Sequence, residues 1–132
     1  MKLVDMAKDI ANKNTCCGYS SFTVGAALLC KSGEVYTGFN VENHGIQSIC
    51  AERTAFVKAL SSGEKRGDFV SITVVGKKLG QEKYIKTVPC GYCRQFMSEY
   101  AGPDFEINLI DEELGKTFSY KLKELLPESF EL

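Results

Sequence analysis

The sequence has no long apolar run, no surplus of charge of either sign, and no repeat or low-complexity stretch. No apolar run approaches the ~20 residues that a membrane-spanning helix needs. The 16 basic and 17 acidic residues give a formal net charge of −1, without the basic field that nucleic-acid binding requires. With 44% hydrophobic and 25% charged residues, the composition is that of a folded globular protein. We therefore expect neither a membrane nor a nucleic-acid partner.

The first residues, MKLVDMAKDIANKN, carry charges every few positions and lack the unbroken apolar segment of a secretion signal. We therefore expect a cytoplasmic protein. In a reducing compartment, six cysteines indicate metal binding, catalysis or burial more often than disulfides. The length of 132 residues predicts one domain, 1–132.

Apolar periodicity and turn signals predict an alternation of helices and strands. The helices are expected at 2–13, 49–60, 90–100 and 121–126, and the strands at 22–31, 35–41, 69–76, 105–110 and 117–122. The stretch 77–88 is charged and irregular, which predicts a surface excursion. This order indicates an α/β fold, a three-layer α/β/α sandwich around a mixed sheet of about five strands.

Three of the six cysteines lie where two predicted helices begin. Cys50 opens one helix, and Cys90 and Cys93 open another directly after Pro89. Residues three apart on a helix share a face, so the sulfurs of Cys90 and Cys93 can reach one point. A helix N-terminus favours the thiolate over the thiol. Three thiolates indicate one Zn²⁺ per chain, with a fourth position left for water as in catalytic zinc sites.

Two residues next to Cys50 complete this hypothesis. Glu52 is the candidate proton carrier for a water that zinc activates. Arg53 is the candidate that offsets the negative charge of the thiolates by hydrogen bonding to sulfur. Taken alone, the 90–93 segment CGYC fits a redox C-x-x-C pair equally well. A non-catalytic zinc protein or a redox protein therefore stays open as an alternative.

Five segments together resemble the small, homotetrameric, zinc-dependent cytidine deaminases, and the resemblance covers nearly the whole chain. The segments are YSSFTVGAA at 19–27, GFNVEN at 38–43, CAERTA at 50–55, PCGYCRQ at 89–95 and LLPESF at 125–130. The P-C-x-x-C segment with a third cysteine is the signature of zinc deaminases. The resemblance implies hydrolytic deamination of cytidine and deoxycytidine to uridine and deoxyuridine, with release of ammonia, in pyrimidine salvage by a homotetramer.

The same resemblance implies roles in the metal site. Cys50, Cys90 and Cys93 would ligate zinc. Glu52 would take a proton from the activated water, pass it to N3 of the cytosine ring, and then protonate the leaving amino group.

It also implies roles toward the substrate. Asn40 and Glu42 would hydrogen bond the ribose 3′-hydroxyl, and Ala51 would offer its backbone N–H to the base. Phe22 would line the pocket beside the base. Phe130 would stack on a substrate held by a neighbouring subunit.

The chain departs from the family in two segments. The loop 44–49, HGIQSI, is about one residue shorter than in cytidine deaminases, and the segment 77–88 is longer. Blasticidin S deaminase, a relative, has a shorter loop still and lacks the ribose-binding glutamate. Deamination of a related aminopyrimidine such as blasticidin S is therefore the alternative, although the presence of Glu42 favours a nucleoside. His44, the single histidine, is expected to face solvent or to contact the rim of the pocket.

Overall fold

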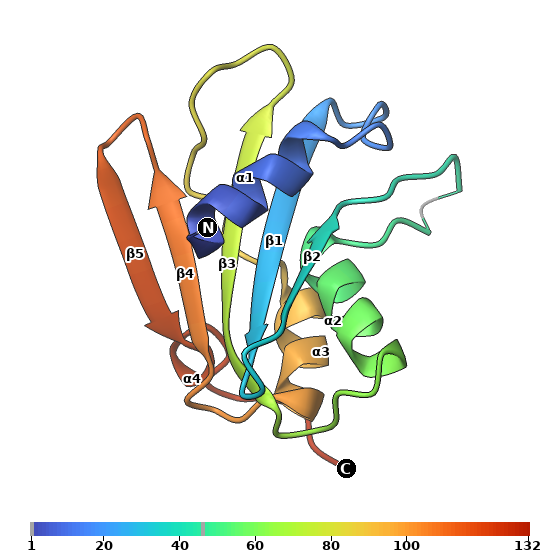
Figure 1. Cartoon of the computed structure of the whole chain (residues 1–132), viewed down its shortest axis with the longest axis vertical. Helices are drawn as coiled ribbons and strands as arrows, with labels where there is room; N and C mark the ends of the chain where they lie inside the picture. Colours follow the sequence, from blue (N-terminus) through green and yellow to red (C-terminus); the bar gives the residue numbers. More distant parts are fainter. Residues whose placement is uncertain (1, 46) are drawn as a thin grey trace.

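The computed structural model describes residues 2–45 and 47–132, and a five-stranded sheet lies at its centre (Figure 1). The strands are β1 (Phe22–Cys30), β2 (Val35–Phe39), β3 (Phe69–Lys78), β4 (Glu106–Asp111) and β5 (Lys116–Lys121). They lie in the order β2-β1-β3-β4-β5. Strands β3 and β4 are parallel and the other neighbours are antiparallel, so the predicted mixed sheet is confirmed.

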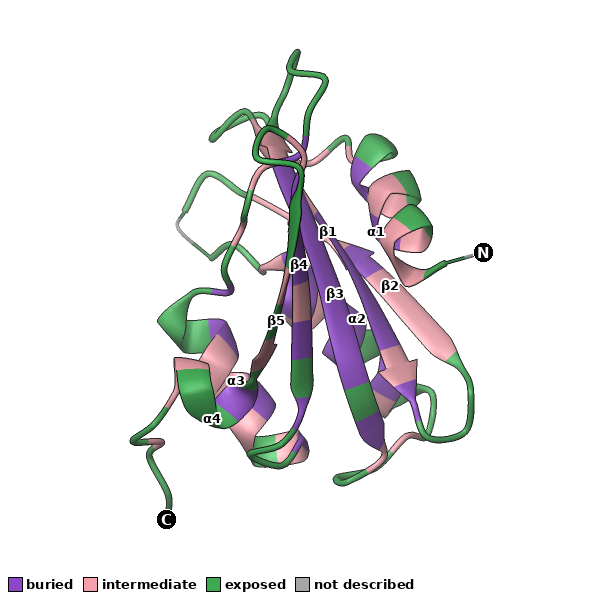
Figure 2. Ribbon diagram, turned by 90° about the vertical axis from the view of Figure 1, so that its left-hand side faces the viewer, coloured by how far each residue is buried: buried purple, intermediate pink, exposed green. Residues whose placement is uncertain are grey.

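Helices cover both faces of this sheet. They are α1 (Leu3–Asn12), α2 (Ala51–Ser61), α3 (Gly91–Tyr100) and the short α4 (Leu122–Leu125). Helix α1 lies on one face, and α2 and α3 lie on the other (Figures 1 and 2). The predicted α/β/α layering is thus confirmed, with every boundary within two residues of its expected position. Among the residues described, no helix is long and apolar enough to cross a bilayer.

The larger core lies between the sheet and helices α2 and α3. Its centre is the fully buried ring of Phe56, which contacts the rings of Phe69, Phe96 and Phe105 at centroid distances of 4.8 to 6.2 Å. Helix α2 approaches β2 so closely that a Cβ on Gly38 would lie 2.7 Å from the backbone nitrogen of Ala55. Only glycine fits at this contact, which places the start of α2 directly against the sheet.

The direction of the strands brings the starts of α2 and α3 to one edge. Strands β2 and β3 are both antiparallel to β1, which lies between them, so β2 and β3 run in the same direction. Each of them is followed by a helix on the same face of the sheet (Figure 1). Both helices therefore begin beyond the carboxyl ends of their strands, the edge at which open α/β sheets bind ligands.

The segment between β3 and α3 is more ordered than the predicted surface excursion over 77–88. Its first two residues extend β3, and Ile85 forms an isolated bridge with Gly76. Tyr84 is only 4% exposed, because it packs with α1 and its hydroxyl donates to Oδ1 of Asn12 at 2.7 Å. Residues 78–83 are exposed, as in the predicted surface excursion, but that prediction was wrong for the buried ring of Tyr84.

Two carboxylates at the end of β4 hold the same segment. Glu112 accepts the backbone N–H of Tyr84 at 2.8 Å and the ammonium of Lys8 at 2.7 Å. Asp111 accepts the backbone N–H of Leu114 at 3.0 Å and that of Lys86 at 3.1 Å. The chain that leads into α3 is therefore anchored a few residues before its helix starts.

The role of Asp111 predicts a pH-dependent stability. The hydrogen bond from Leu114, and then that from Lys86, hold the pKa of Asp111 below its usual 3.8. Because the folded pKa is lowered, the stabilisation is complete above the unfolded pKa and is lost as pH falls through the folded pKa. We expect Asp111→Asn to lower the urea midpoint at pH 7, and the difference from the wild type to shrink below about pH 4.

Urea titrations at pH values from 7 down to 3 would measure this effect. Asp9→Asn is the control, because Asp9 forms only an exposed ion pair with Lys13. A constant difference between Asp111→Asn and the wild type over the whole range would contradict the prediction.

Candidate functional site

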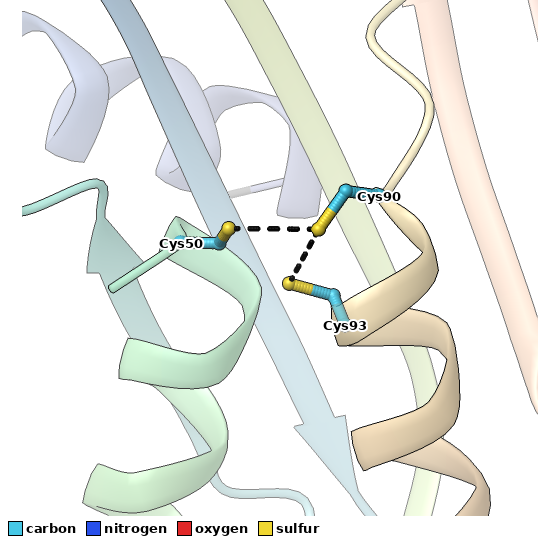
Figure 3. A group of neighbouring side chains, drawn as sticks. All are labelled: Cys50, Cys90 and Cys93. Atoms are coloured by element: carbon cyan, nitrogen blue, oxygen red, sulfur yellow. Dashed lines mark hydrogen bonds between the residues drawn. The ribbon is translucent and has the colours of Figure 1, made fainter. Parts of the chain in front are cut away.

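Three sulfur atoms from α2 and α3 converge beyond the carboxyl ends of β2 and β3 (Figure 3). The Sγ atoms of Cys50 and Cys90 are 3.8 Å apart, and those of Cys90 and Cys93 are 3.7 Å apart. All three sulfurs lie within 4.8 Å of one another. A tetrahedral zinc ion with Zn–S bonds of about 2.3 Å places its sulfur ligands roughly 3.8 Å apart. The spacing of this cluster therefore fits zinc.

The backbone at the two helix starts explains this convergence. Cys50 is the N-cap of α2 and Cys90 is the N-cap of α3, both with extended backbone angles. Neither side chain caps its own helix, so both sulfurs are turned toward each other instead. Cys93 lies in the first turn of α3 and is fully buried beneath them. The partial positive charge of two helix N-termini thus faces one group of sulfurs.

The same distances bear on the redox alternative. Disulfide sulfurs are bonded at about 2.05 Å, whereas all three of these cysteines are free thiols. A C-x-x-C redox pair uses two sulfurs, and the third sulfur from α2 has no role in such a pair. The arrangement favours a metal centre.

The thiols of the cluster shift one another's pKa values. The hydrogen bond from Cys93, followed by contacts with Arg53, lowers the pKa of Cys50 to about 5. The pKa of the Cys93 thiol is raised, because it holds the proton of that hydrogen bond and is buried. Arg53 places Nη2 3.0 Å from the carbonyl of Ser48 and 3.9 Å from Sγ of Cys50. Its guanidinium is thus the positive group next to the sulfurs.

Glu52 is buried beside the cluster. Its side chain is only 4% exposed, in the first turn of α2. Burial raises the pKa of Glu52 to about 7, and the charge of Cys50 acts in the same direction. A carboxyl group with a pKa near neutrality can accept a proton and return it, which is what general acid–base catalysis needs.

A cavity of about 210 Å³ opens beside these groups. It is lined by Val24, Asn40, Glu42, Ser48, Ile49, Cys50, Ala51, Glu52, Thr87, Val88 and Cys90. The structure therefore brings six of the sequence-predicted residues to one cavity, and Cys93 lies behind Cys90. The candidate proton carrier and the sulfur cluster line the same cavity.

Hydrogen bonds to neighbouring segments hold the side chain of Asn40 in the polar wall of the cavity. The side-chain oxygen of Asn40 accepts from Nδ2 of Asn14 at 2.7 Å and from the N–H of Val24 at 2.9 Å, and its Nδ2 donates to Phe22 at 2.9 Å. One N–H of this amide therefore has no acceptor within the described residues.

Glu42 is oriented by the loop that precedes β1. Its Oε1 accepts the backbone N–H groups of Tyr19 at 3.1 Å and Ser20 at 3.0 Å. Partial burial acts to raise the pKa of Glu42, but the hydrogen bonds from Ser20 and Tyr19 lower it, so the group is a carboxylate at neutral pH. Ala51 occupies the first position of α2, where the backbone N–H has no acceptor within the helix.

Two predicted substrate contacts lie outside the cavity of the single chain. Val24 supplies the wall from β1, whereas the ring of Phe22 lies against Gly76, where a Cβ would be 2.8 Å from it. Alternation along the strand places Phe22 on the same face as Val24, two residues nearer the strand start. Phe130 is 65% exposed in the C-terminal segment. Neither ring is among the lining residues of the described chain.

Sequence reasoning missed several side chains that build this site. Asn14 fixes the amide of Asn40 from 26 residues away, and no local pattern marks that pairing. Thr87 and Val88 line the cavity from the segment that the sequence presented as a surface excursion. Their position directly before Pro89 and Cys90 was the available signal, because the residues that enter a ligand-bearing helix lie next to its site.

The comparisons with known proteins agree with this geometry. The family model described as the cytidine and deoxycytidylate deaminase zinc-binding region matches residues 1–107. A probable cytidine deaminase from Dictyostelium discoideum is 40% identical over 131 residues, which cover 98% of this chain and 82% of that protein. A cytidine deaminase from Halalkalibacterium halodurans is 43% identical over 114 residues, covering 85% and 80% of the two chains.

A solved structure and a second kind of relative extend this similarity. The crystal structure of cytidine deaminase from Burkholderia pseudomallei matches with a TM-score of 0.86 and 39% identity, covering 97% of this chain and 96% of that chain. A blasticidin-S deaminase from Bacillus cereus is 36% identical over 108 residues, which cover 79% of this chain and 74% of that protein.

The cluster predicts that zinc is lost when one sulfur is removed. We expect Cys90→Ala to bind less than a tenth of the wild-type zinc and to melt at a lower temperature, because metal binding contributes to folding. Elemental analysis of the purified protein and a thermal melt would measure both. Cys16→Ala is the matched control, since Cys16 lies outside the cluster. Full zinc occupancy in Cys90→Ala would contradict the ligand assignment.

Proposed function

The chain belongs to the cytidine and deoxycytidylate deaminase family, and we propose that it is a zinc-dependent enzyme that hydrolyses cytidine to uridine and ammonia. One observation carries this proposal. Three sulfurs at the spacing of zinc ligands lie beside the buried carboxyl group of Glu52, on a cavity that Asn40 and Glu42 also line. This combination supplies a metal site, a proton carrier and polar groups for a sugar.

Cys50, Cys90 and Cys93 would hold one zinc ion per chain. When bound, zinc lowers the pKa of a water molecule and so supplies a nucleophile at neutral pH. The two helix N-termini and Arg53 offset the negative charge that three thiolates bring to the site. Cys93 is buried, Cys50 is half-buried and Cys90 is exposed, so one side of the cluster is open to the cavity.

Glu52 would move the protons of the reaction. It takes a proton from the attacking water and gives it to N3 of the cytosine ring as the C4–O bond forms. It then transfers the second proton to the amino group on C4, so that the C4–N bond breaks and ammonia leaves. Burial raises the pKa of this carboxyl group to about 7, so it can both accept and return a proton near neutral pH.

The polar wall would position the nucleoside. The backbone N–H of Ala51 would bind the base, and the spare N–H of Asn40 together with Oε2 of Glu42 would bind the ribose 3′-hydroxyl. Neither ribose contact involves the 2′-hydroxyl, so we propose deoxycytidine as a second substrate. Phe22, at the outer end of the face that carries Val24, would lie beside the bound base.

Phe130 would complete the site of a neighbouring copy in a homotetramer. Its ring is exposed, while its backbone is held on both sides by Gln95, whose Nε2 donates to the carbonyl at 2.9 Å and whose Oε1 accepts the N–H at 3.0 Å. Because the backbone is held and the ring is exposed, the ring is available for contact with another chain. We place this assembly in pyrimidine salvage in the cytoplasm, where its free thiols would remain reduced.

Blasticidin S is the second candidate substrate. The shorter loop 44–49 and the similarity to the blasticidin-S deaminase of Bacillus cereus favour it. The carboxylate of Glu42 faces the cavity and favours a nucleoside hydroxyl instead. The two candidate substrates therefore differ in whether they need the carboxylate of Glu42.

If Glu52 transfers the protons, replacing it should lower kcat without removing zinc. We expect Glu52→Gln to retain wild-type zinc, because the three sulfurs are unchanged. Its kcat would fall by about 10²- to 10⁴-fold, the usual contribution of a positioned acid–base group. Elemental analysis and turnover would be measured on the same sample. Near-normal turnover with full zinc would exclude this role for Glu52.

A substrate panel tests the reaction itself. We expect the ultraviolet absorbance of cytidine and deoxycytidine to shift to that of uridine and deoxyuridine, with one ammonia released per nucleoside. Glu42→Ala should raise the KM for cytidine more than it lowers kcat, since it removes a binding contact. Turnover of blasticidin S without turnover of either nucleoside would favour the second candidate.

A further inference from the structure

We propose that Tyr92 is a positioning residue that holds Arg53 against the sulfur cluster and thereby slows the release of zinc. The proposal rests on the proposed function in one respect, namely that the three cysteines bind zinc. It concerns a residue within the C-x-x-C segment that neither binds metal nor lines the cavity.

The tyrosine ring joins the two ligand-bearing helices. Tyr92 is the second residue of α3, between Cys90 and Cys93, and 67% of the residue is exposed. Its ring nevertheless packs on the guanidinium of Arg53 from α2, with Cζ 4.1 Å from the ring centroid. An arginine at this distance over an aromatic face makes a cation–π contact. Any motion of Arg53 away from the cluster would break it.

Arg53 has few other contacts that could hold it. Nη2 reaches the carbonyl of Ser48 at 3.0 Å and the sulfur of Cys50 at 3.9 Å. Nε is buried and finds no hydrogen-bond partner among the described residues. Within 2–45 and 47–132, no carboxylate forms an ion pair with this guanidinium. One edge of the group is therefore held by two acceptors, and its face is held by Tyr92.

The position of Arg53 matters because of the charge it faces. Three thiolates around a divalent cation carry one net negative charge, and Arg53 supplies one positive charge beside it. Without the ring, the guanidinium can swing toward water, where its interaction with sulfur is weakened by the high dielectric constant. The hydrogen bond from Nη2 to Sγ of Cys50 would then be lost, and losing a group that hydrogen bonds to a metal ligand weakens metal binding. Zinc would then be released faster. Tyr92 would therefore act on the zinc through Arg53.

The test first compares the wild type with two variants, all as the zinc-loaded full chain. Tyr92→Leu keeps an apolar side chain but removes the aromatic face, and Tyr92→Phe keeps that face. Zinc transfer to an excess of a chromogenic chelator is followed by absorbance at pH 7. A cation–π contact at an exposed site predicts release about two- to fivefold faster in Tyr92→Leu. Tyr92→Phe is expected to release zinc at the wild-type rate.

Measuring the effect of Tyr92→Leu in an Arg53→Gln variant tests whether Tyr92 acts through Arg53. If Tyr92 acts through Arg53, adding Tyr92→Leu to Arg53→Gln leaves the release rate unchanged, because the partner is already absent. Urea titrations of the zinc-loaded proteins establish that the variants are folded. Wild-type release from Tyr92→Leu, or the same acceleration in both backgrounds, would overturn the inference while leaving the proposed function intact. Failure of the wild-type chain to bind zinc would overturn both.

Discussion

The site depends on one geometric constraint, namely that two helices begin at the same edge of the sheet. Strands β2 and β3 run in the same direction on either side of β1, and each feeds a helix on the same face. The two helix starts must therefore meet, and the residues that cap them must meet with them. Gly38 sets how closely α2 approaches, since its contact leaves no room for a Cβ. The spacing of the sulfurs follows from this packing.

One turn of helix carries most of the residues to which we assign the chemistry. From Cys50 to Arg53, successive side chains point in directions about 100° apart, so one turn faces several surroundings. The sulfur of Cys50 meets the two sulfurs from α3, and Glu52 is buried against the cavity. Arg53 hydrogen bonds to the carbonyl of Ser48 and packs on the ring of Tyr92. Within this turn, a buried carboxyl group and three sulfur atoms lie next to one positively charged side chain, that of Arg53.

The elements of the fold could be predicted because apolar periodicity is a local property. The helix around Phe56 and the strand from Phe69 carry their patterns within ten residues or so, and their positions were confirmed. Contacts between distant segments could not be predicted this way. Asn14 orients Asn40 across 26 residues, and Tyr84 turns inward from a segment that is otherwise charged. In each case, one side chain is placed by its surroundings rather than by its neighbours in sequence.

The sequence by itself determined the order of the elements and the ligand chemistry. Cysteines at two helix starts with an acid two residues after the first are properties of the chain, readable without coordinates. Only the tertiary structure decided that Sγ of Cys90 lies 3.8 Å from Sγ of Cys50 and 3.7 Å from Sγ of Cys93. It also decided that Val24 rather than Phe22 lines the cavity. It also decided that Tyr92 packs on Arg53. Such distances depend on how closely helices and strands pack, and packing is settled by all the side chains between them at once.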